Sequence, residues 1–163
     1  MREICDREEI LLIFDEVQTG MGMTGKMWAF QHYDVIPDVI SFGKKTQVCG
    51  ILANKEKLDQ IPNNVFKESS RINSTFGGNY IDMLRFKLIL EVIEQEKLVE
   101  NAAEKGKYIL SKLNEIAKET KKIHSVRGLG LFIAFDFSSD LDRSEFIKTC
   151  FENHMIILPC GEN

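Results

Sequence analysis

A continuous apolar run that ends on a carboxylate is the feature that most constrains how this chain can fold. Residues Ile10–Phe14 read Ile-Leu-Leu-Ile-Phe, and Asp15 follows directly. Such an uninterrupted run predicts a strand that is covered on both faces in a largely parallel sheet. Because ligands of open α/β sheets bind beside the carboxyl ends of strands, we expect chemistry first in the polar segment 15–19.

Two more apolar segments follow, at Val39–Phe42 and Val48–Ala53. The residues between them, 43–47, form a connection of hairpin length. The two segments are therefore predicted to be antiparallel neighbours in the same sheet.

The second half of the chain shows helical spacing of apolar residues. It predicts a helix from Tyr80 to about Gln95 and another from Leu98 to about Lys118. The second helix is expected to bury one face, made of Ala102, Tyr108, Ile109, Leu113 and Ile116.

A strand at Leu131–Phe137, a helix at Arg143–Asn153 and a final strand at Met155–Leu158 are predicted next. This order of elements indicates the α/β class, with part of a large domain over residues 1–95. Residues 96–163 are expected to form a linking helix and part of a smaller α+β domain.

Composition excludes several classes of function. The 163 residues carry a net charge of −4, and 21 Lys and Arg residues are interspersed with 25 acidic ones, so no basic stripe predicts nucleic-acid binding. No apolar run reaches the roughly 18 residues of a membrane span. The polar start of the chain is unlike a signal peptide, so a cytoplasmic location is the default expectation.

A metal site is not expected. The cysteines form no CxxC pair and the histidines show no metal-ligand spacing, so free thiols in a reducing compartment are predicted. These residues are Cys5, Cys49, Cys150, Cys160, His32, His124 and His154.

The segment Gly20–Gly25 satisfies the pattern GxGxxG of dinucleotide-binding proteins. That fingerprint needs its first glycine directly after the strand and a long helix after the third. Here five residues, Asp15 to Thr19, intervene between the apolar run and the first glycine, and Pro37 comes too soon after Gly25 for a crossover helix. A loop shaped by glycines is favoured over a nicotinamide site.

Four elements in order supply what a pyridoxal-phosphate site requires: Asp15, Gln18, Lys44 and the turn 74–79. A lysine amine must bond to the cofactor aldehyde, and a carboxylate must keep the pyridine nitrogen protonated. Hydroxyls, glycine amides and a helix N-terminus can hold the phosphate. Each residue alone also fits an ordinary structural role, such as a turn or a solvated lysine.

A family resemblance favours the chemical interpretation. Leu11–Gly20 resembles the aspartate signature of class III pyridoxal-phosphate aminotransferases, Pro37–Lys44 resembles their lysine signature, and Thr75–Asn79 resembles a third family element. The similarity covers essentially the whole chain. It implies part of the large domain of a fold-type I pyridoxal-phosphate transferase, followed by the start of the small C-terminal domain.

The resemblance also implies a role for each matching residue. Asp15 pairs with the pyridine nitrogen, Val17 packs on the ring, and Gln18 reaches the phenolic oxygen. Lys44 bonds to the cofactor and carries the proton, although spacing alone does not separate it from Lys45. Ser74 and Thr75 bind the phosphate, that of the neighbouring subunit, which implies a homodimer with shared active sites.

Within the family, Phe42–Gly50 and Arg71–Asn79 are similar to the versions in members that act on L-lysine, and Met23 stands where many other members have arginine. The implied reaction moves the ε-amino group of L-lysine to 2-oxoglutarate, giving 2-aminoadipate 6-semialdehyde and glutamate. An ornithine or 4-aminobutyrate aminotransferase is the alternative enzyme.

The resemblance finally implies that the chain is truncated. Family subunits are longer at both ends, and no arginine here convincingly replaces the one that binds the substrate carboxylate, since Arg71 and Arg127 fit structural roles. We therefore expect the chain to be inactive and marginally stable alone. The alternative is a non-catalytic remnant or an assembly module.

Overall fold

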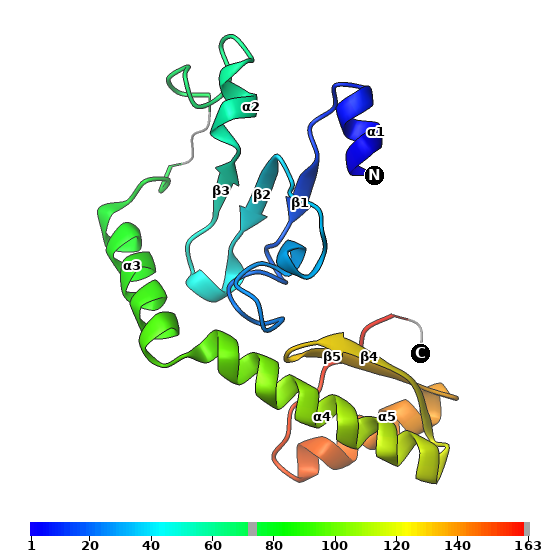
Figure 1. Ribbon diagram of the computed structural model, residues 1–163. Helices are drawn as coiled ribbons and strands as arrows, with labels where there is room; N and C mark the ends of the chain where they lie inside the picture. Colours follow the sequence, from blue (N-terminus) through cyan, green and yellow to red (C-terminus); the bar gives the residue numbers. More distant parts are fainter. Residues whose placement is uncertain (72–74, 162–163) are drawn as a thin grey trace.

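The computed structural model describes residues 1–71 and 75–161, and these form an α/β arrangement of two parts joined by helices (Figure 1). A small three-stranded sheet lies in the N-terminal half. A β-hairpin with two helices lies in the C-terminal half. The α/β class predicted from the sequence agrees with this mixture of elements.

The sheet has the order β1-β2-β3. Strand β1 (Ile13–Asp15) runs parallel to β2 (Val39–Phe42), and β2 runs antiparallel to β3 (Gly50–Ala53). The antiparallel pairing predicted for the second and third segments is confirmed. In the parallel pair, Asp15 lies opposite Ser41.

Strand β1 differs from its prediction in length and in burial. It begins at Ile13 instead of Ile10, and those two side chains are 61% and 56% exposed, while Leu12 between them is buried. The prediction of cover on both faces is wrong for the residues described. The physical reason is that no described residues cover Ile13 on its face of the sheet, and β1 is also an edge strand, paired only with β2.

A buried aspartate just before β2 forms ion pairs with two short helices. Asp38 is 3% exposed and accepts hydrogen bonds from the Leu12 amide (2.7 Å) and from Arg2 of α1 (Arg2–Arg7; 2.9 Å). The Nζ of Lys57, in α2 (Lys55–Asp59), lies 3.0 Å from the same carboxylate. Burial by itself raises the pKa of Asp38, but these three partners together lower it below its ordinary value.

A second buried carboxylate closes the long loop between β1 and β2. Glu16 is 2% exposed, and its two oxygens accept hydrogen bonds from the Thr19 hydroxyl and from the amides of Ala29 (3.0 Å) and Phe30 (2.8 Å). The loop contains only a short 3-10 helix, η1 (Ala29–His32). A long helix after the glycines, which a dinucleotide site needs, is therefore not present in this loop.

Two consecutive helices join the parts of the molecule. Helix α3 (Tyr80–Gln95) and helix α4 (Leu98–Thr120) confirm both predicted segments. The ring of Phe86 in α3 stacks on Phe42 of β2 at 5.3 Å between centroids, which holds α3 beside the sheet. Within residues 1–71 and 75–161, none of the helices combines the length and apolar character that a membrane span needs.

The buried face predicted for α4 is only partly correct. Ala102 is buried, but Tyr108, Ile109 and Ile116 are 63%, 37% and 45% exposed, and Leu113 is half-buried. The helix contacts the hairpin strand β4 along part of its length. The other apolar residues of α4 are therefore only partly covered by the described residues.

The C-terminal part is a hairpin with a helix on it. Strand β4 (Ile123–Leu129) pairs antiparallel with β5 (Phe132–Phe137), and α5 (Asp140–Glu152) follows. The sequence predicted β5 and α5 but not β4, whose mixed composition hides its strand character. Met155–Leu158, predicted as a strand, forms no strand in the described part of the chain and joins neither sheet.

Glycines allow the loop after β1 to touch the C-terminal part. A Cβ on Gly106 of α4 would lie 2.0 Å from the carbonyl oxygen of Gly130, and one on Gly130 would lie 2.5 Å from that of Met23. The Leu131 amide donates to this same Met23 oxygen at 2.9 Å. The loop, α4 and the β4–β5 turn are thus in backbone contact, which side chains would prevent.

We predict that Glu16→Gln destabilises the chain, because an amide cannot accept on both sides as the carboxylate does. The loss should be about 1–3 kcal/mol in the free energy of unfolding, the usual range for a buried hydrogen-bonding group left without a partner. Urea unfolding followed by circular dichroism measures it. Glu68→Gln, at an exposed position, is the matched control, and equal stability of the two variants would contradict the role given to Glu16.

A pH prediction follows from Asp38. Its folded pKa lies below the unfolded value of about 3.9, so its stabilising contribution is complete above that pH and is lost as pH falls through the folded pKa. Asp38→Asn should therefore lower the free energy of unfolding at pH 7 and make its acid dependence shallower. Unfolding curves between pH 7 and pH 2 test this. The exposed Asp34→Asn should leave the profile unchanged, and a parallel shift of both profiles would refute the assignment.

Candidate active site

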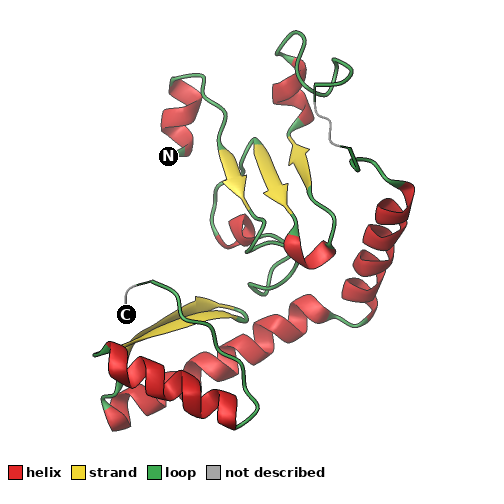
Figure 2. Ribbon diagram, turned by 180° about the vertical axis from the view of Figure 1, so that it is seen from behind, coloured by secondary structure: helices red, strands yellow, loops and turns green. Residues whose placement is uncertain are grey.

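The carboxyl ends of the two parallel strands bring together the residues that the sequence analysis singled out. Strands β1 and β2 run in the same direction, so their carboxyl ends lie at the same end of the sheet (Figure 2). Asp15 is the last residue of β1, and Lys44 follows shortly after the end of β2. The loop 16–22 and the 3-10 helix η2 (Lys44–Thr46) gather at this end. The parallel pairing therefore creates a site from residues that are 29 positions apart.

The carboxylate of Asp15 is exposed and held by two donors. Its Oδ1 accepts from the Val17 amide and from the Ser41 hydroxyl, each at 3.0 Å. These two hydrogen bonds lower the pKa of Asp15, and the charge of Lys44 lowers it further, although a small loss of hydration acts in the opposite direction. The group is thus a carboxylate at neutral pH, and its Oδ2 makes no hydrogen bond within the described residues.

Lys44 lies across the site from this carboxylate. Its Nζ donates to the side-chain oxygen of Gln18 at 3.4 Å, a long contact, and its charge acts on Asp15. The backbone of Lys44 has a φ of 54°, in the left-handed region that non-glycine residues seldom adopt. Strained backbone of this kind is frequent at functional positions, where the surrounding structure enforces it.

The neighbouring Lys45 has different partners. Its Nζ donates to the backbone carbonyl oxygen of Gln18. Desolvation lowers the pKa of Lys45, the charge of Lys44 lowers it further, and the charge of Glu16 opposes both. The lysine doublet, ambiguous by spacing, is thus divided: Lys44 acts electrostatically on Asp15, and Lys45 interacts with Glu16.

The remaining predicted site residues are not all brought together. Val17 is half-buried, and its amide binds Asp15. Thr75 is exposed, and within the described ranges no hydrogen bond joins it to the residues of the strand ends. Ser74 lies outside the described residues. The turn that follows ends at Asn79, whose side chain caps α3 by accepting from the Ile81 amide at 2.9 Å.

Two residues of the site were missed in the sequence. The hydroxyl of Ser41 donates a hydrogen bond to the Asp15 carboxylate, and the carboxylate of Glu16 holds the loop that carries Gln18 by accepting hydrogen bonds from two backbone amides. The strand register would have identified Ser41, because it lies opposite Asp15 in the parallel pair. For Glu16 the signal was its place next to Asp15, since consecutive side chains of an extended chain point to opposite sides.

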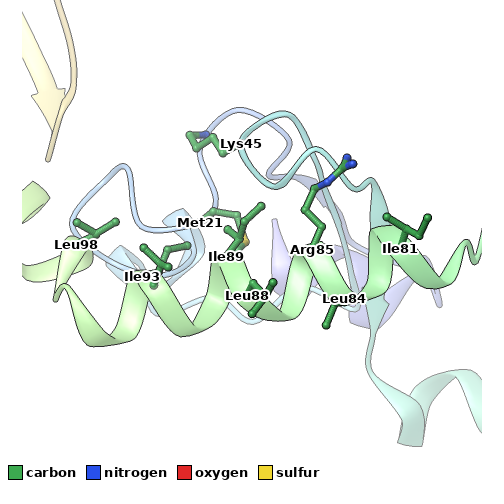
Figure 3. A pocket seen from close by; sticks show the side chains of 10 residues that line it. Met21, Lys45, Ile81, Leu84, Arg85, Leu88, Ile89, Ile93 and Leu98 are labelled. Carbon is green, nitrogen blue, oxygen red and sulfur yellow. The ribbon is translucent and has the colours of Figure 1, made fainter.

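An apolar groove of about 600 Å³ adjoins the site, between α3 and the loop after β1 (Figure 3). Lys45 and Arg85 are the two charged residues that line it, and Figure 3 shows Arg85 projecting from α3 and Lys45 on the opposite side of the groove, near Met21. The other lining residues are Met21, Ile81, Leu84, Leu88, Ile89, Val92, Ile93 and Leu98.

Known proteins resemble this chain closely. It is 49% identical over 162 residues to the L-lysine-epsilon aminotransferase of Mycobacterium tuberculosis. The matched region covers 99% of this chain and 36% of the relative. The solved lysine aminotransferase from M. tuberculosis superposes with a TM-score of 0.92 over 99% of this chain and 37% of that chain, also at 49% identity.

More distant aminotransferases share the fold. The ornithine aminotransferase of Plasmodium yoelii is 33% identical, with a TM-score of 0.86 over 99% of this chain and 43% of that chain. The chain thus spans little more than a third of the length of the curated lysine aminotransferases that it matches. Because residues 1–163 all match the aminotransferase class-III family, the chain belongs to that family.

Proposed function

We propose that this chain is part of a pyridoxal-phosphate-dependent aminotransferase that moves the ε-amino group of L-lysine to 2-oxoglutarate. The products are 2-aminoadipate 6-semialdehyde and glutamate. The observation that carries the proposal is the convergence of Asp15 and Lys44 at adjacent ends of two parallel strands, with Gln18 in contact with Lys44. The similarity to lysine aminotransferases supports the choice of amine donor.

The residues at the strand ends fit the cofactor chemically. When bound, pyridoxal phosphate supplies an aldehyde for the amine and a protonated ring that withdraws electrons from the reacting carbon. Asp15 suits the ring nitrogen, because its carboxylate is ionised at neutral pH and Oδ2 is left to accept the ring N–H. Ser41 and Val17 fix the orientation of this carboxylate from its other oxygen.

The other site residues divide the remaining tasks. The Nζ of Lys44 would bond to the cofactor aldehyde, and as a free amine it would carry the proton of the substrate carbon. The side-chain amide of Gln18 donates to the phenolic oxygen. Val17 packs on the ring, and Ser74 and Thr75 bind phosphate.

The position of Thr75 suits a site shared between subunits. Thr75 is exposed and has no hydrogen bond to Asp15, Gln18 or Lys44 within the described part of the chain. In a homodimer its hydroxyl would serve the partner's phosphate. In keeping with this arrangement, we propose residues 1–95 as part of the cofactor-binding domain and 96–163 as the linking helix with part of the small domain.

A labelling experiment tests the role of Lys44. The purified chain is incubated with pyridoxal phosphate, reduced with borohydride and digested, and the labelled peptide is identified by mass spectrometry. We expect the label on Lys44, its loss in Lys44→Ala and its retention in the matched variant Lys45→Ala. A label that remains in Lys44→Ala, or that lies on Lys45, would overturn the assignment.

A donor comparison tests the substrate. We expect glutamate formation from 2-oxoglutarate to be at least about tenfold faster with L-lysine than with L-ornithine or 4-aminobutyrate, since a misfitted polar end group costs roughly that factor or more. The assay uses the chain alone and together with the remaining part of a family subunit. Faster turnover of L-ornithine would contradict the donor. An absence of turnover in both formats, together with an unlabelled Lys44, would favour a non-catalytic assembly module.

A further inference from the structure

Two adjacent lysines hold a single residue of the opposite loop. The Nζ of Lys44 donates to the side-chain oxygen of Gln18, and the Nζ of Lys45 donates to its backbone carbonyl oxygen. The proposed reaction uses Lys44 and the Gln18 side chain but gives Lys45 no task. The contact of Lys45 is therefore an interaction that the chemistry itself does not explain.

The surroundings of Lys45 favour this contact. Its side chain lines a groove whose other walls are apolar apart from Arg85 (Figure 3). The lysine as a whole is exposed, but its ammonium loses part of its hydration beside this apolar surface, which lowers the pKa of Lys45. The carbonyl oxygen of Gln18 compensates part of this loss, and a hydrogen bond from a charged donor is stronger than one between neutral groups.

The loop that carries Gln18 is also fixed by Glu16. That buried carboxylate accepts hydrogen bonds from the Thr19 hydroxyl and from the amides of Ala29 and Phe30, so it ties the loop to η1. Lys45 supplies the tie from the η2 side. With both ties present, the backbone of Gln18 has little freedom, and its side chain is presented to Lys44.

We propose that Lys45 is a positioning residue, which holds the Gln18 carbonyl so that the Gln18 side chain is set beside Lys44 before any ligand binds. The inference rests on the proposed function, because the benefit of the tie is a preformed partner for the cofactor's phenolic oxygen. Without the tie, binding would have to order Gln18 and would lose affinity accordingly.

The test compares three variants of the chain. Lys45→Met keeps the length and apolar stem but removes the charged donor, Lys45→Arg keeps a charged donor, and Arg85→Met removes the other charge of the groove. Arg85 pairs with Asp82 at 3.3 Å and has no contact with Gln18, so it is the matched control. The dissociation constant of pyridoxal phosphate is measured by fluorescence, and amide hydrogen exchange of segment 16–22 is measured without cofactor.

We expect Lys45→Met to weaken cofactor binding about tenfold, as for the loss of one hydrogen bond from a charged group, and to speed exchange in segment 16–22. Lys44 should still be labelled by borohydride in this variant. Lys45→Arg should restore most of the affinity and the slow exchange, and Arg85→Met should match the parent in both. Thermal unfolding of all variants separates a loss of positioning from a general loss of folding.

The possible failures can be told apart. Unchanged exchange and unchanged affinity in Lys45→Met would overturn the positioning role. So would equal losses in Lys45→Met and Arg85→Met, because these would report only on the charge of the groove. A parent chain in which Lys44 takes no label defeats the proposed function, whereas the exchange measurement still decides whether Lys45 holds the loop.

Discussion

The parallel pairing of β1 with β2 is the interaction on which the site depends. It places Asp15 opposite Ser41, and the Glu16 amide continues the ladder by donating to the Ser41 carbonyl at 2.9 Å. A shift of this register by one residue would send every side chain of β1 to the other face. The side chain of Asp15 would then point to the other face of the sheet, and its carboxylate would no longer lie on the same side as Lys44. The relative positions of Asp15 and Lys44 thus depend on the short stretch of backbone pairing between β1 and β2.

Adjacent residues of like charge divide structural and chemical tasks at the carboxyl ends of these strands. Asp15 is exposed to ligands, whereas the next residue, Glu16, is buried and closes the loop. In the same way Lys44 acts on Asp15, and Lys45 contacts the Gln18 backbone near Glu16. Consecutive side chains at a strand end diverge, so a doublet can serve both sides of a loop. Glu16 and Lys45 thus hold the loop through hydrogen bonds to neutral groups, which leaves Asp15 and Lys44 for the proposed cofactor.

The fold was predictable where local periodicity and packing agree. Helix α3 begins and ends where its apolar spacing indicated, because that pattern needs no distant partner to be recognised. Strand β4 was missed because polar residues interrupt its pattern, and its pairing with β5 decides its conformation. Conversely, Met155–Leu158 has an apolar strand pattern but pairs with no strand among the described residues. The exposure of Ile13 was equally hidden, since burial depends on neighbours that a single segment does not encode.

The candidate site was predictable as an order of residues but not as a set of contacts. Family-like motifs identified Asp15 and Lys44, yet spacing along the chain could not choose between the two lysines of the doublet. The resemblance favours Lys44, which directly follows Phe42-Gly43 as in the family signature, and the structure adds that the charge of Lys44 acts on Asp15. Ser41 lies within the segment that resembles the lysine signature, but its hydrogen bond to Asp15 crosses between strands, and the motif alone did not indicate it. A cofactor that bridges two strand ends needs residues that are close in space. Their separation along the sequence does not reveal this closeness, because it arises only when the two strands pair.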